Sequence, residues 1–66
     1  MIFQKGQIYK PKEHIYETLD CGPKSRLELC DWSEKSHYWR CIIDENYFGG
    51  ITEDKLVNDW ELENVL

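Results

Sequence analysis

Apolar and polar side chains alternate along much of this chain, and a period of two is the pattern of a half-buried β-strand. Turn-forming residues separate the alternating segments at intervals of about five to eight residues, the usual length of strands. The pattern predicts strands over residues 7–10, 14–20, 26–32 and 37–44. In the third of these segments, Leu27 and Leu29 are expected to point into a core.

The other segments show the same division into two faces. In the segment 37–44, Trp39, Cys41 and Ile43 share one face, and Tyr38 and Arg40 lie on the other. In the segment 14–20, spacing places Ile15 and Leu19 together, opposite Tyr16 and Thr18. Both segments are therefore expected to bury one side only.

Polar connections and one helical turn complete the predicted architecture. The segments 33–36 and 44–46 are polar and are expected to form hairpin loops, the second leading into Tyr47 and Phe48. Residues 52–58 predict a single helical or 3₁₀ turn with Leu56 and Val57 inward. Trp60 and Leu62 then alternate with acidic residues, which indicates a last short strand.

These elements predict one small all-β domain over residues 1–66. A chain of 66 residues has no room for a second core. Five or six short strands with one turn before the last must curl over a single core, and a small, partly open barrel hides most strand edges.

Several segments resemble the SH3-like small barrels found among short phage and prophage proteins. The resemblance is carried by "FQKGQIY" near the start, the hairpin meander, "YFGGITEDKL", and the closing "WEL". It spans most of the chain and implies an SH3-like barrel. Members of this class serve as adaptors, nucleic-acid binders, peptide readers and inhibitors, so the resemblance selects none of these functions.

Charge is distributed unevenly along the chain. The first 43 residues carry seven basic and six acidic side chains, whereas residues 44–66 carry seven acidic side chains and only Lys55. An acidic region of this kind either keeps a protein soluble or docks basic partners. The candidate docking residues are Asp44, Glu45, Glu53, Asp54, Asp59, Glu61 and Glu63.

The pair Gly49-Gly50 before a helix start raises the possibility of a phosphate-binding loop. However, Glu53 and Asp54 occupy the first turn of that helix and would repel an anion. We therefore expect the glycine pair to form a corner between a strand and a turn, with Thr52 as the helix N-cap.

Metal binding and catalysis are not expected. Cys21, Cys30, His37 and Cys41 lack the close pairs of a zinc site, and His37 and Cys41 would lie about 13 Å apart along one strand. We predict no cofactor and no enzymatic activity, because no nucleophile motif accompanies these residues. An odd number of cysteines without a pairing pattern, and no secretory signal, favour a reducing, cytoplasmic location.

Binding to another protein is the function that the sequence favours. Tyr16, Trp32, Tyr38 and Tyr47 are aromatic residues expected on outward faces, where such side chains anchor interfaces. Together with the acidic region they predict a basic or nucleic-acid-handling protein partner, and the carboxylates suggest a phage-type inhibitor that mimics nucleic acid. The alternative is a nucleic-acid-binding barrel that uses Lys5, Lys10, Lys12, Lys24, Arg26, Lys35 and Arg40.

Overall fold

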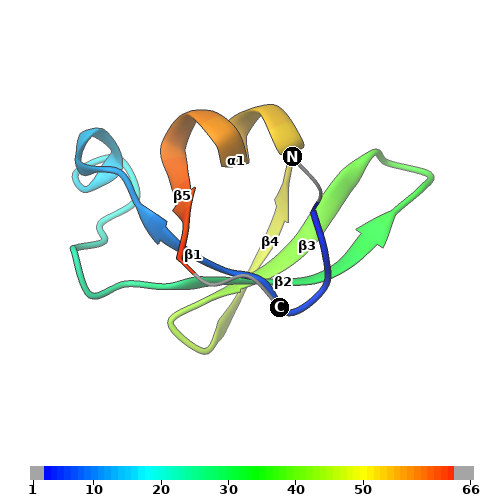
Figure 1. Cartoon of the computed structure of the whole chain (residues 1–66), viewed down its shortest axis with the longest axis horizontal. Coiled ribbons are helices and arrows are strands. Elements are labelled where there is room, and N and C mark those ends of the chain that lie inside the picture. The colour runs from blue at the N-terminus through cyan, green and yellow to red at the C-terminus, as the bar shows by residue number, and fades with distance from the viewer. Residues whose placement is uncertain (1–2, 64–66) are drawn as a thin grey trace.

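The structure, a computed structural model, describes residues 3–63, so residues 1–2 and 64–66 of the predicted domain lie outside the described part. Its elements are β1 (Ile8–Pro11), the 3₁₀ helix η1 (Glu13–Ile15), β2 (Leu27–Ser33), β3 (Tyr38–Ile43), β4 (Asn46–Ile51), α1 (Glu53–Asp59) and β5 (Trp60–Leu62). The strands form one antiparallel sheet in the order β4-β3-β2-β1-β5. Figure 1 shows α1 over one face of the curved sheet, with η1 at one end and the β2–β3 hairpin at the other. The mostly-β prediction is confirmed.

Strand β1 joins the edge strand β5 to the rest of the sheet. Tyr9 lies opposite Leu27 of β2 and opposite Leu62 of β5, so this short strand pairs on both sides. Pro11, which has no N–H to donate, ends the strand opposite Trp60. The backbone N–H of the next residue, Lys12, donates to the carbonyl of Asp59 over 2.9 Å. These bonds therefore join β1, near the start of the chain, to β5 and to the end of α1.

The core lies between the sheet and α1. Its buried side chains are Tyr9, Ile15, Leu27, Leu29, Trp39, Cys41, Ile51, Leu56 and Trp60. The predicted inward positions of the β2 leucines and of Trp39 and Cys41 are confirmed. The buried hydroxyl of Tyr9 donates to Oε1 of Gln7 over 3.0 Å, which satisfies a polar group that would otherwise destabilise the core.

The predicted strand over residues 14–20 is wrong, since this segment forms η1 and a series of turns. The N–H of Leu19 donates to the carbonyl of Ile15, a helical i→i−4 bond of 3.0 Å. A spacing of four residues places two side chains on one face in a strand and also in a helical turn. Because the period alone does not separate the two, these apolar residues gave a misleading signal.

The strand β2 contains an irregularity that changes the orientation of Trp32. Its register with β3 shifts between Leu29 and Asp31, and beyond this bulge Trp32 lies opposite Trp39. Strict alternation would have placed Trp32 outward with Glu28. The bulge instead turns the indole of Trp32 to the face that carries the core.

The glycine pair does not form the predicted corner, because both glycines lie within β4. Gly49 pairs with Cys41 across the sheet and has φ +125, and Gly50 pairs with Arg40. The corner falls at Thr52, which is confirmed as the N-cap of α1, its side chain accepting from the N–H of Lys55 over 3.2 Å.

The β3–β4 hairpin and the inward face of α1 were both predicted from the sequence. The hairpin between β3 and β4 is confirmed, and Asp44 and Glu45 at its tip both have positive φ, as a two-residue hairpin turn requires. On α1, Leu56 is buried as predicted, but Val57 is 46% exposed, so its predicted inward position is wrong. A helix this short presents only one narrow face to the core.

No helix within residues 3–63 is long and apolar enough to cross a membrane.

The Tyr38 ring packs directly on Gly50, which leads to a prediction about stability. A Cβ atom at Gly50 would lie 2.6–2.9 Å from three atoms of that ring. We expect Gly50→Ala to lower the free energy of unfolding by about 1–3 kcal/mol, as overpacking does, in urea titrations. The matched control is Gly22→Ala, where an added Cβ meets nothing within 4 Å. Equal stability of the two variants would contradict this packing.

Candidate functional site

The four aromatic candidates do not form one surface. Tyr16 follows η1, and Tyr47, on β4, is 70% exposed. Tyr38 lies against Gly50 at the start of β3, whereas Trp32 contacts Trp39 on the face that carries the core. Trp32 is placed close to two carboxylates from the acidic last third of the chain, those of Glu53 and Asp54.

Trp32 lines a hollow between the β2–β3 hairpin and the start of α1. We call this the aromatic–acidic hollow; its volume is about 410 Å³, and its lining residues are Trp32, His37, Thr52, Glu53 and Asp54. The hairpin supplies the rings of Trp32 and His37. The first turn of α1 supplies the carboxylates of Glu53 and Asp54. The hollow therefore combines an aromatic wall with an acidic wall.

Hydrogen bonds fix the aromatic wall. The rings of Trp32 and Trp39 are 5.7 Å apart, and His37 stands edge-on to Trp32 at 6.2 Å. The indole N–H of Trp32 donates to Glu34 over 2.6 Å, and that of Trp39 donates to Glu53 over 3.2 Å. Each indole thus has a carboxylate at its positive edge. Trp39 is buried in the core, so the half-buried Trp32 supplies the electron-rich ring face that a cation can contact.

The acidic wall lies where a helix would otherwise attract an anion. Glu53 and Asp54 occupy the first turn of α1, and both are exposed. Their charges offset the positive end of the helix dipole. The chemistry that fits this hollow is a cationic side chain, held by a ring face and by carboxylate oxygens.

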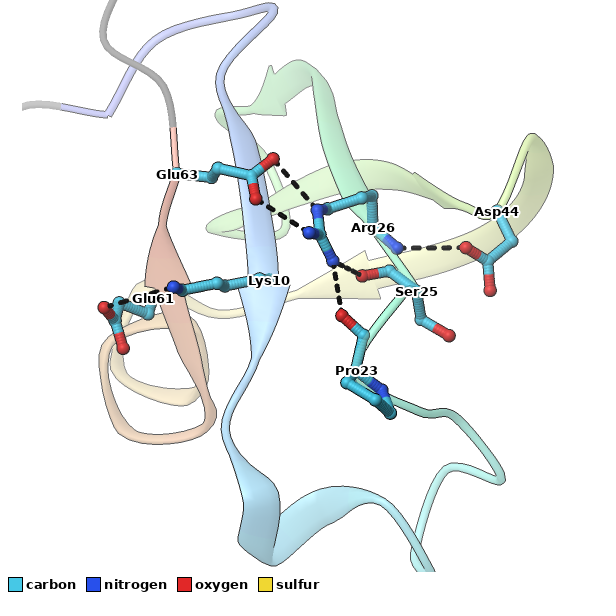
Figure 2. Close-up of polar contacts among 7 residues, drawn as sticks. All are labelled: Lys10, Pro23, Ser25, Arg26, Asp44, Glu61 and Glu63. Carbon is cyan, nitrogen blue, oxygen red and sulfur yellow. Dashed lines mark hydrogen bonds and ion pairs between the residues drawn. The ribbon is translucent and has the colours of Figure 1, made fainter.

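The remaining acidic candidates are dispersed, and most of them have partners. Figure 2 shows Glu63 against the guanidinium of Arg26, and Glu61 close to Lys10 at 3.8 Å. The carboxylate of Asp44 accepts from the backbone N–H of Arg26 over 2.9 Å. Within residues 3–63, the side chains of Glu45 and Asp54 form no hydrogen bond or ion pair. The carboxylates therefore do not present one continuous acidic edge.

Arg26 is a structural residue in this arrangement. Its Nε and Nη2 atoms contact the two oxygens of Glu63 at 2.9 and 2.8 Å. Its Nη1 atom donates to the carbonyls of Pro23 and Ser25 over 2.8 and 2.7 Å (Figure 2). These bonds tie the start of β2 to the residue that follows β5.

The basic residues of the nucleic-acid alternative are also largely engaged within the chain. Arg40 donates to both oxygens of Asp31, and its hydrogen bonds hold the pKa of that carboxyl below its usual range. Lys12 donates to the carbonyl of Val57 over 2.9 Å. With Lys10 and Arg26 also paired, four of the seven basic candidates already have intramolecular partners.

The cysteines and histidines are not gathered into one site in the described part of the chain. No group of three or more His, Cys, Asp or Glu side chains there is placed to hold a metal ion. The thiols of Cys21 and Cys30 lie 3.9 Å from the backbone carbonyls of Ile15 and Glu28. Within residues 3–63, neither histidine hydrogen-bonds to a cysteine.

Cys41 differs from the other two cysteines in its surroundings. It is completely buried, and this burial raises its thiol pKa to about 11. At pH 8 about one molecule in a thousand would carry the reactive thiolate. We expect iodoacetamide to modify Cys41 last in the native protein, as measured by peptide mass spectrometry. Denatured protein is the control, in which all three should react, and equal native rates for Cys30 and Cys41 would contradict the burial.

Asp59, the last candidate carboxylate, joins the end of α1 to η1. Its Oδ1 accepts from His14 Nε2 over 2.9 Å, its Oδ2 lies 3.6 Å from Lys55 Nζ, and its side chain is 18% exposed. The hydrogen bond from His14, followed by the Lys55 charge, lowers the pKa of Asp59. Asp59 therefore serves the fold.

This lowered pKa predicts a pH dependence of stability. A carboxyl with a depressed pKa stabilises the native state above its ordinary value near 3.9, and the stabilisation is lost as the pH falls through the native pKa. We expect Asp59→Asn to lower the free energy of unfolding by about 1 kcal/mol at pH 6. The difference from the wild type should disappear at the acid end of a urea-titration series. Glu17→Gln, an exposed carboxyl without an ion pair among residues 3–63, is the control. An Asp59→Asn effect that is the same at every pH would contradict the ion-pair origin.

Sequence reasoning missed the hollow because it assigned its parts to different surfaces. The alternating pattern places Trp32 on the outer face, and His37 stands out only as a candidate metal ligand or as a partner for a cysteine thiolate. The spacing of Trp32 and Trp39 is the signal that indicates their contact. Two residues equally far from the middle of a hairpin loop lie opposite each other on the paired strands.

Comparison with known proteins adds no assignment: no family model, no curated protein and no solved structure was found to match the chain.

Proposed function

We propose that this protein is a non-enzymatic module that binds another protein through a basic segment of that partner. The observation that carries the proposal is the aromatic–acidic hollow, where Trp32 meets Glu53 and Asp54. A lysine or arginine side chain supplies what both walls of the hollow attract, a cation for the ring face and donors for the carboxylates. The net charge of −5 also favours association with a basic partner.

The SH3-like barrel is part of the proposal. Strands β1 to β4 follow one another as a meander, α1 precedes β5, and β5 returns to pair with β1. This order supports an SH3-like identity. A cytoplasmic location and a role as a phage-type inhibitor of a nucleic-acid-handling protein belong to the same proposal as narrower forms of it. The dispersed carboxylates favour a local cation site over broad mimicry of nucleic acid.

The proposal predicts that removing the acidic wall abolishes binding while the fold remains intact. In the variant Glu53→Gln/Asp54→Asn, the glutamine amide still offers an oxygen to the indole N–H of Trp39. We expect the immobilised wild type to capture a protein from nuclease-treated lysate, and the double variant to bind that purified protein about tenfold more weakly. The melting temperature should be nearly unchanged.

Glu17→Gln is the matched control, because Glu17 is exposed and lies outside the hollow. It should bind like the wild type. Binding that survives in the double variant would refute the hollow as the binding site. Capture that disappears on nuclease treatment would instead support direct nucleic-acid binding by the basic residues.

A further inference from the structure

Strand β4 is an edge of the sheet that has no partner on its outer side among the described residues. Apart from the hydrogen bonds of the sheet itself, no backbone hydrogen bond within residues 3–63 involves residues 46–51. The strand carries no charged residue and no proline, the usual means of blocking edge pairing. The opposite edge, β5, is only three residues long and carries Glu61. Strand β4 is thus the less protected edge.

An apolar groove lies alongside this strand. It has a volume of about 400 Å³, and its apolar lining includes Ile15, Leu19, Phe48, Ile51 and Trp60. A bulge at Phe48, between the pairs of Gly49 with Cys41 and of Tyr47 with Ile42, leaves that ring 45% exposed. Tyr47 beside it is 70% exposed. An edge strand next to an apolar groove offers backbone hydrogen bonds and a place for side chains together.

Carboxylates flank β4 at both ends. Asp44 and Glu45 form the turn that leads into the strand, and Glu53 and Asp54 follow it at the start of α1. A six-residue strand is about 20 Å long, so the two acidic groups are separated by that order of distance. An occupant of the edge that carries basic residues at both of its ends would match this charge pattern.

A second copy of the chain does not fit the same edge. Two identical edge strands related by a two-fold axis pair antiparallel. This arrangement would bring Asp44 and Glu45 of one copy toward Glu53 and Asp54 of the other, at both ends of the interface. Like charges opposite each other across strands are destabilising. The charge pattern therefore selects a foreign, basic strand.

We propose that β4 takes up an extended segment of the partner protein as an additional strand. The segment has alternating apolar side chains that face the groove, and lysine or arginine residues near each end, about six to eight residues apart. One of these terminal cations occupies the aromatic–acidic hollow beside Glu53. This inference rests on the proposed function, because the hollow and the edge share the carboxylates of α1.

The test uses a synthetic probe peptide with two lysines at each end and alternating valine and threonine between them. Amide NMR spectra and hydrogen exchange of the protein are measured as the peptide is added. We expect saturable shifts in β4 and at the indole N–H of Trp32, and at least tenfold slower exchange of outward-facing β4 amides. A second peptide has the same lysines, but prolines replace the threonines, so it keeps the charge and loses the strand hydrogen bonds.

The outcomes separate the inference from the function on which it rests. Binding of the first peptide with slowed β4 exchange, and at least tenfold weaker binding of the proline peptide, supports strand addition. Equal binding of both peptides without slowed exchange overturns strand addition and leaves the cation site standing. Shifts at neither β4 nor the hollow with either peptide would overturn both proposals.

A pair of protein variants locates the contact. Tyr47→Lys places a positive charge on the β4 edge, and we expect it to weaken binding of the lysine-flanked peptide at least fivefold. Val57→Lys makes the same change at another exposed apolar position, on α1, and should leave the affinity unchanged. Equal affinities of the two variants would place the peptide elsewhere and overturn the proposal.

Discussion

The pairing of β1 on both of its sides is the constraint on which the rest of this structure depends. Four residues connect the meander to β5, and through β5 they fix the position of α1 over the core. Tyr9 places a side chain of this strand in the core, since it is buried and its backbone lies between Leu27 and Leu62. In a chain that buries so few side chains, each of these contacts accounts for a large share of the stability.

The proposed binding surfaces follow from the same arrangement. Because β5 returns to β1, α1 is held across the sheet, and its first turn meets the β2–β3 hairpin beside Trp32. Because β5 pairs with β1 and not with β4, β4 remains at an edge. The fold thus places the aromatic–acidic hollow and an open strand next to each other, and both involve the short connection from Ile51 to Asp54.

Much of the fold was predictable because strand alternation and turn chemistry are local signals. Leu27, Leu29, Trp39 and Cys41 followed the pattern, and Thr52 took the N-cap position that its side chain favours. The errors arose where local signals are degenerate or interrupted. Four-residue spacing in the η1 segment suits two conformations, and the bulge in β2 reverses the faces beyond it. The hollow depends on that bulge and on the placement of α1, which are tertiary features that no local pattern contains.

The pairing of Tyr9 with Leu62 also has a consequence for synthesis of the chain. Of all the strand pairs in the described residues, this one joins the earliest strand to the latest. A chain emerging from the ribosome can form the meander early, but β1 lacks its second neighbour until β5 has left the exit tunnel. During that interval the Tyr9 side of the core is exposed to solvent, and contacts between such distant residues form slowly. Cooperative folding of this domain is therefore completed only after β5 is free to pair with β1.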